Sequence, residues 1–140
     1  MPVATALDGL PAPPCAKLLG WHILDARPDE GWLRCGFEAR PEFANPTGAI
    51  QGGFLAAMLD DAMGPTVFVM TKGAVYTATI DMTVSYLSPA RPGPLFGEGR
   101  VVQLGKSVGF LEATLTDAAG TVIARATSSV RLVPAAKALS

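Results

Sequence analysis

Residues 45–61 read NPTGAIQGGFLAAMLDD, and this stretch decides the fold. A loop rich in Asn, Pro and Gly leads into a pair of glycines, after which Ala and Leu become frequent. The spacing of the apolar residues predicts a helix from Gly53 to about Met70, with one continuous apolar stripe. This helix is apolar enough to be buried, yet it carries two acids near its middle, Asp60 and Asp61.

Alternating apolar and polar residues on both sides of this helix predict strands. Two strands are expected before it, and after residue 73 the pattern is entirely that of strands and tight turns. We expect the last four strands to follow one another as a meander. We also expect Pro65 to kink the helix or end it early, because proline lacks an N–H and clashes with the preceding turn. The order predicts an α+β fold, with one antiparallel sheet wrapped around a single long helix.

The length of 140 residues fits one domain with one core. We expect a flexible N-terminal arm over residues 1–13, the domain over 14–134 and a C-terminal tail over 135–140. Apolar residues make up 49% of the chain and charged residues only 16%. A chain so poor in charge is expected to bury apolar surface between subunits, as a homodimer or homotetramer.

Charge and cysteine content exclude several classes of partner and compartment. The net charge is -1 and the basic residues are scattered, so we expect no nucleic acid partner. No apolar run approaches the roughly 20 residues of a membrane span, and the N-terminus lacks the pattern of a signal peptide. Two cysteines, Cys15 and Cys35, fit a reducing compartment, which predicts the cytoplasm.

The two adjacent acids point about 100° apart on a helix, so they face different surroundings. Asp61 is expected to be solvated or paired. Asp60 shares its face with small residues, namely Gly53, Ala56, Ala57 and Gly64. On this face a carboxylate is either a structural acid satisfied by a hydrogen bond or a base or nucleophile in a narrow cleft, and the residues alone leave both readings open.

The glycines precede the helix at a position that suits an oxyanion. A helix N-terminus offers unpaired N–H groups, and glycine lets a ligand reach them without meeting a Cβ. Taken alone, the pair equally fits a flexible start to a helix. The single histidine, His22, makes a Ser-His-Asp triad improbable, and one histidine with two distant cysteines does not make a metal site. Cys35 alternates with apolar residues and is expected in the core.

The pattern resembles the hotdog-fold acyl-CoA thioesterases of the phenylacetic-acid-degradation (PaaI-like) type. These usually read N-x-x-G-x-x-H-G-G, with an Asp nine residues after the His. Here the residues at these positions are Asn45, Gly48, Gln51, Gly52, Gly53 and Asp60, and all but Gln51 match. The strand and turn over residues 81–91 (DMTVSYLSPAR) and the Gly105-Lys106-Ser107 hairpin also match. The resemblance runs from about Lys17 to Leu132.

The resemblance implies an active site at the boundary between two subunits, with acyl-CoA as substrate and no cofactor or metal. Asp60 would activate water or attack the thioester carbonyl, and the Gly52 N–H would polarise that carbonyl. Asn45 would orient the carbonyl or the water, and Thr79 would hold the water. Asp60 and Thr79 would come from one subunit, with Asn45 and Gly52 from its partner.

The resemblance also implies a substrate-binding set around these residues. Its members are Gly53, Ser88, Pro89, Arg91, Lys106 and Ser107. Arg91 and Lys106 are candidates to meet the nucleotide phosphates of CoA, although each also fits a solvated surface charge. The acyl group is not specified, because apolar side chains of the helix such as Phe54 and Met58 fit the core at least as well as an acyl pocket.

One departure from the family's pattern opens an alternative function. Gln51 stands where the family has histidine, and glutamine does not titrate near neutral pH. Gln51 is therefore a candidate catalytic residue only through hydrogen bonding. The alternative is an acyl-CoA binding or sensing protein without catalysis. A hotdog dehydratase ranks lower, because it needs a catalytic histidine, and a purely structural oligomer would have no need of Asn45, Gly52 and Asp60 at this spacing.

Overall fold

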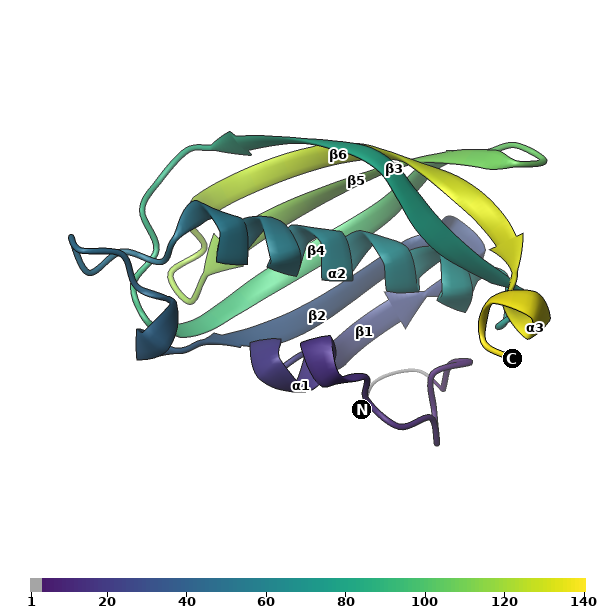
Figure 1. Ribbon diagram of the computed structural model, residues 1–140, viewed down its shortest axis with the longest axis horizontal. Coiled ribbons are helices and arrows are strands. Elements are labelled where there is room, and N and C mark those ends of the chain that lie inside the picture. The colour runs from purple at the N-terminus through teal and green to yellow at the C-terminus, as the bar shows by residue number, and fades with distance from the viewer. Residues whose placement is uncertain (1–3) are drawn as a thin grey trace.

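The computed structural model describes residues 4–140 as one antiparallel sheet that curves around a long helix (Figure 1). The helices are α1 (Pro14–Leu19), α2 (Gly52–Met70) and α3 (Ala135–Ala138), with 3-10 turns at Pro28–Glu30 and Pro41–Phe43. The strands are β1 (His22–Arg27), β2 (Trp32–Ala39), β3 (Val75–Tyr86), β4 (Gly93–Leu104), β5 (Val108–Asp117) and β6 (Val122–Pro134). The expected hotdog fold is confirmed.

The order of strands in the sheet is β1-β2-β4-β5-β6-β3, so the expected meander of the last four strands is wrong in part. Strands β4, β5 and β6 do follow one another through tight turns. Strand β3 instead crosses over and pairs with β6, which leaves β3 as an edge of the sheet. The crossover places β3 beside the middle of α2 (Figure 1).

The core lies between the concave face of the sheet and α2. Side chains that alternate along β2, among them Leu33, Cys35 and Phe37, are at most 1% exposed, which confirms the predicted strand and the core position of Cys35. Met58 and Met63 of α2 are equally buried, so they belong to the core rather than to an acyl pocket. Strand β4 packs closely on α2 because Gly97 and Gly99 have no side chain there.

The alternation expected along β3 is interrupted by a bulge. The register with β6 shifts between Thr79 and Asp81, so Ile80 is an extra residue and its side chain is 58% exposed. A bulge reverses which parity of residue faces inward. Residues on the N-terminal side of Ile80 therefore face α2 at odd positions, including Thr79, and those beyond it face α2 at even positions, including Tyr86.

Pro65 does not end α2, which is continuous from Gly52 to Met70. Two features compensate for the proline. Gly64 precedes it and has no Cβ to clash with the proline ring. The carbonyl of Asp61, which loses its helical partner, accepts a hydrogen bond from the Trp21 indole Nε1 at 3.0 Å. The expectation that Pro65 ends the helix early is therefore wrong, and the Trp21 indole supplies a donor from outside the helix to the carbonyl that Pro65 leaves without a partner.

Within residues 4–140, α2 alone has the length and apolar composition of a membrane span, contrary to the expectation that no run comes close. Leu59, Ala62 and Val67 are among its fully buried residues, and they identify it as the core helix of the sheet. The first three residues of the expected arm lie outside the described residues. Further along that arm, Leu7 packs against the core, and at the C-terminus α3 buries Ala135.

Candidate active site

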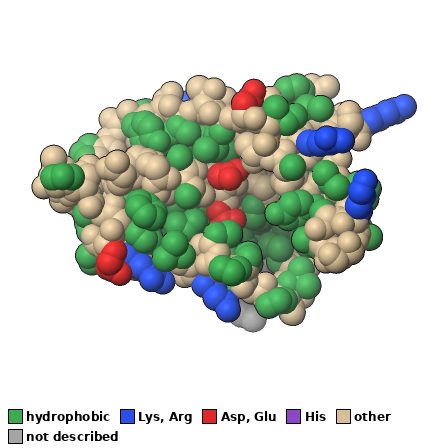
Figure 2. Space-filling model, viewed as in Figure 1, with side chains coloured by type: hydrophobic (Ala, Val, Ile, Leu, Met, Phe, Trp, Pro, Cys, Tyr) green, Lys and Arg blue, Asp and Glu red, His purple; other side chains and the backbone are tan. Residues whose placement is uncertain are grey.

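Asp60 lies halfway along α2 and faces the edge strand β3. The Thr79 hydroxyl donates a hydrogen bond of 3.0 Å to Asp60 Oδ1. The bulge at Ile80 fixes the direction of the Thr79 side chain. Both side chains are exposed in one chain, and acidic side chains stand out in the middle of this face among apolar ones (Figure 2). The structure therefore brings together two of the five residues predicted to be catalytic.

The N-terminus of α2 presents free backbone donors. Gln51 is the N-cap, and its side chain makes no capping hydrogen bond, so Gly52 and Gly53 begin the first turn with N–H groups that point out of the helix. The Tyr86 hydroxyl donates to the Gly52 carbonyl at 2.8 Å and fixes this turn against β3. Tyr86 was not among the predicted site residues, although its position at the end of the β3 alternation is visible in the sequence.

Asn45 organises the loop before α2. Its side-chain Oδ1 accepts hydrogen bonds from the backbone N–H of Thr47 at 2.9 Å and from the Thr47 hydroxyl at 2.6 Å. Since the oxygen is occupied, the amide Nδ2 is the part of Asn45 that can meet a substrate, and it can only donate. Arg91 donates to the Thr47 carbonyl at 3.1 Å. Arg91, which is expected to bind the CoA phosphates, therefore lies against this same loop.

The two halves of the predicted catalytic set are far apart in one chain. Gly52 and Asp60 are eight residues apart on a helix, which corresponds to about 12 Å along the axis. A single thioester cannot touch the Gly52 N–H and a water held by Asp60 across that distance. One chain therefore contains both halves without assembling them on one carbonyl.

Asp61 is the more buried of the two acids, so the expectation that it is solvated or paired is wrong. Its Oδ2 is buried, and the described residues offer it no hydrogen-bond partner. Burial, with a smaller contribution from the neighbouring Asp60 charge, raises the pKa of Asp61 from 3.8 to about 6. Burial and then the Asp61 charge also raise the pKa of the Cys35 thiol well above its usual range, which makes this thiol unreactive.

The predicted substrate-binding residues fall at two ends of the sheet. Ser88, Pro89 and Arg91 follow β3, next to the loop that precedes α2. Lys106 and Ser107 lie in the hairpin between β4 and β5, at the opposite end of the 12-residue strand β4 (Figure 1). In one chain these two groups cannot bind one phosphate cluster.

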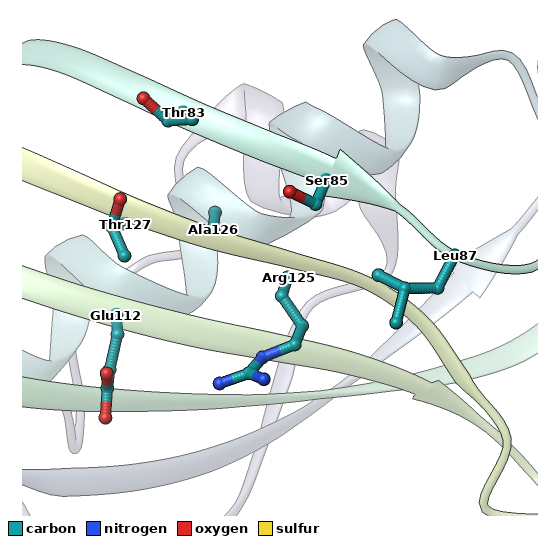
Figure 3. A pocket seen from close by; sticks show the side chains of 7 residues that line it. All are labelled: Thr83, Ser85, Leu87, Glu112, Arg125, Ala126 and Thr127. Carbon is teal, nitrogen blue, oxygen red and sulfur yellow. The ribbon is translucent and has the colours of Figure 1, made fainter.

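A hollow in the surface of the single chain does not contain Asp60. It lies on the outer face of the sheet, where Thr83, Arg125 and Glu112 from three adjacent strands line it, and α2 is on the other side of the sheet (Figure 3). This hollow is shallow and open. A second hollow beside Arg91 is lined by the prolines of the β3–β4 connection and by the turn after β5. Neither contains the Asp60 carboxylate.

Comparison with known proteins agrees with this geometry. Residues 47–124 match the Thioesterase superfamily. A protein of Halobacterium salinarum that is provisionally named an esterase is 36% identical over 114 residues, which cover 79% of this chain and 75% of that protein. Human acyl-coenzyme A thioesterase 13 is 29% identical over 97 residues, covering 68% of this chain and 69% of the relative.

The solved structures include a phenylacetic acid degradation-related protein of Ralstonia eutropha JMP134, provisionally described as a thioesterase. It superimposes with a TM-score of 0.84 at 31% identity, over 90% of this chain and 95% of that protein. The chain therefore belongs to the thioesterase superfamily, and it is a thioester hydrolase with the hotdog fold. Within that superfamily it is of the PaaI-like type.

Proposed function

We propose that this protein hydrolyses acyl-CoA to the free acid and CoA in a homodimer, with Asp60 as the reacting carboxylate. The observation that carries this proposal is the 3.0 Å hydrogen bond that Thr79 of β3 donates to Asp60 in the middle of α2. Asp60 either removes a proton from the attacking water or attacks the thioester carbon itself. Thr79 holds the carboxylate, and in the first route also the water, in line with that carbon.

The exposed edge strand β3 supports the homodimer. β3 is 12 residues long, and Asp81 is its only charged residue. Edge strands of monomers are normally blunted by charges or by proline. Tyr76 and Ile80 are 45% and 58% exposed on this strand. Pairing of two β3 edges would cover these side chains, join the two sheets and bring the partner's α2 N-terminus toward Asp60.

In that dimer the Gly52 N–H of one chain polarises the carbonyl that is attacked by the other chain's Asp60 or by the water that this Asp60 activates. Backbone donors at a helix N-terminus stabilise the negative oxygen of the tetrahedral intermediate. The Asn45 amide, whose Oδ1 is already occupied by Thr47, adds a second donor through its Nδ2. The side chain of Gln51, which makes no capping bond, orients the same carbonyl.

The replacement of histidine by Gln51 is compatible with hydrolysis. The leaving group is the thiolate of CoA, and a thiol has a pKa of about 8.5, so it can leave without being protonated first. A titrating side chain at position 51 is therefore dispensable for expulsion of the thiolate. Gln51 needs only to hold the carbonyl, which its amide can do as donor.

For the carrier, Arg91 with Ser88, Pro89 and Gly53 of one chain, and Lys106 with Ser107 of the other chain, are proposed to meet the CoA phosphates. Arg91 already lies against the loop that precedes α2. If Arg91→Ala combined with Lys106→Ala leaves the KM for acyl-CoA unchanged, this assignment fails. We further propose a cytoplasmic protein with the domain bounded at residues 14 and 134.

The direct test of the function is release of free thiol from short-chain, long-chain and aromatic acyl-CoAs by the purified protein. We expect turnover of at least one class. Binding of acyl-CoA without any thiol release would contradict the proposal and support the binding alternative.

A mixing experiment tests the split site. Gly52→Pro removes the N–H that the proposal uses, and proline is well tolerated at the first position of a helix. Gly52→Ala is the matched control, because it adds the same Cβ against Tyr86 and keeps the N–H. Asp60→Asn and Gly52→Pro chains should each be inactive alone, and after mixing should regain about a quarter of the activity, since half of the dimers would hold one intact site. Mixtures that stay inactive would contradict a shared site.

A further inference from the structure

A proline stands one turn after the acidic pair, at Pro65 of α2. In a regular helix the N–H of residue 65 would donate to the carbonyl of Asp61. Proline has no N–H, and its ring presses against that same carbonyl. Pro65 therefore removes a backbone hydrogen bond from the turn of α2 that carries Asp60 and Asp61.

A residue far away in the sequence occupies that carbonyl. The Trp21 indole Nε1 donates to the Asp61 oxygen at 3.0 Å, across 40 residues of chain. Trp21 is itself firmly held. Its backbone N–H donates to the Ala16 carbonyl at 2.9 Å, directly after the left-handed Gly20 that ends α1, and its ring packs against the core. The indole is thus a fixed external donor and not a mobile surface group.

The position of this contact matters for the reaction. The Asp61 carbonyl is one residue from Asp60, whose carboxylate must stay within hydrogen-bond distance of Thr79. Displacement of a reacting group by about 1 Å can cost about a hundredfold in rate. If the Asp61 carbonyl were unpartnered, this turn could tilt outward around Pro65 and carry Asp60 with it.

We propose that Trp21 is a positioning residue for Asp60: by holding the carbonyl that Pro65 leaves without a helical partner, its indole fixes the turn that presents Asp60 to Thr79. This inference rests on the proposed role of Asp60. The inference goes beyond the proposed role of Asp60 because it assigns a function to Trp21, which lies outside the site, and to Pro65 inside the helix.

The chain offers a rescue experiment. Trp21→Phe keeps an aromatic ring but removes the donor, and Pro65→Ala restores a backbone N–H that can serve the same carbonyl from within the helix. We expect Trp21→Phe to lower kcat about tenfold with little change in KM, because the substrate contacts remain. Pro65→Ala should stay within about twofold of wild type, since a carbonyl oxygen accepts two hydrogen bonds. The double variant should recover to within about threefold.

Trp32→Phe is the matched control, because the same chemical change is made at a residue whose ring stacks on Arg27 and not on α2. It should leave kcat unchanged. A double variant as slow as Trp21→Phe would overturn the inference, because Trp21 would then act through something other than this carbonyl. A Trp21→Phe enzyme with wild-type kcat would overturn it as well.

Thermal melts of the wild type, Trp21→Phe, Pro65→Ala and the double variant provide a readout that does not depend on Asp60. The loss of Tm caused by Trp21→Phe should be smaller in the Pro65→Ala background than in the wild-type background. Equal losses in both backgrounds would contradict the inference even if Trp21→Phe alone expresses poorly. Asp60→Asn measured alongside separates the two proposals. An inactive Asp60→Asn with an unaffected Trp21→Phe leaves the proposed function standing and removes only the role of Trp21, whereas an active Asp60→Asn removes both.

Discussion

Replacing Asp61 by asparagine should make the protein more stable at neutral pH, by an amount that grows as the pH rises from about 4 to about 6. The folded state holds the Asp61 proton more tightly than the unfolded chain, because the pKa of this half-buried carboxyl is raised from 3.8 to about 6. A group with a raised pKa contributes stability below its unfolded pKa and loses it as the pH passes through the folded pKa. The amide introduced by Asp61→Asn does not titrate, so the variant would show no such loss.

The size of the effect follows from the same shift. A rise from 3.8 to about 6 corresponds to at most about 3 kcal/mol of unfolding free energy. The side chain is only partly shielded from water, and screening reduces this to about 1 kcal/mol. The buried Oδ2 of Asp61 has no hydrogen-bond partner, so the substitution breaks no hydrogen bond there, which also favours the stability of the variant.

Urea unfolding at pH 4.5 and pH 7.5, with equal protein concentrations, measures this difference. Because about a third of the effect is already present at pH 4.5, the stability of Asp61→Asn relative to wild type should rise by about 0.7 kcal/mol between the two pH values. Glu112→Gln, which removes a carboxylate from the outer face of the sheet, should show no comparable rise. A difference in unfolding free energy between Asp61→Asn and wild type that stays constant with pH, or that shrinks as the pH rises, would refute the reasoning.

Three other substitutions follow from single contacts. Gly99→Ala should destabilise the protein by about 3 kcal/mol in urea unfolding, because its Cβ would overlap the Ala62 carbonyl of α2; a wild-type midpoint would contradict the close approach. Thr79→Val should lower kcat about tenfold through loss of the Asp60 hydrogen bond, whereas Thr79→Ser should retain the rate. Ile80→Lys, on the exposed β3 edge, should sediment as a monomer and lack thioesterase activity; an active dimer would argue against β3 pairing.

Local patterns were sufficient to predict the α+β class of the fold and the helix that carries Asp60. The apolar periodicity of α2 and the alternation along β2 are properties of neighbouring residues, and both are confirmed. The resemblance supplied the roles, and the structure places Asp60 beside Thr79 as it implies. The likeness could be recognised because the spacing from Gln51 to Asp60 is set by helix geometry, which similar sequences share.

Long-range contacts were not predictable from those patterns. The crossover that pairs β3 with β6 depends on which edge is free after the sheet has formed, and no residue of β3 specifies it. The donor that meets the Asp61 carbonyl, which Pro65 leaves without a helical partner, belongs to Trp21, 44 positions before the proline in the chain. The burial of Asp61 depends on the elements that cover it, whereas helical phase alone says only that it points away from Asp60.

The most direct test of the central claim, that Asp60 is the reacting carboxylate, compares kcat for Asp60→Asn and Asp61→Asn with the best acyl-CoA substrate. The two variants make the same chemical change at adjacent positions. Asp60→Asn should lose about a hundredfold or more in kcat while remaining a folded dimer, because the base or nucleophile is gone. Asp61→Asn should change kcat only a few-fold. Full activity of a folded Asp60→Asn dimer would contradict the account.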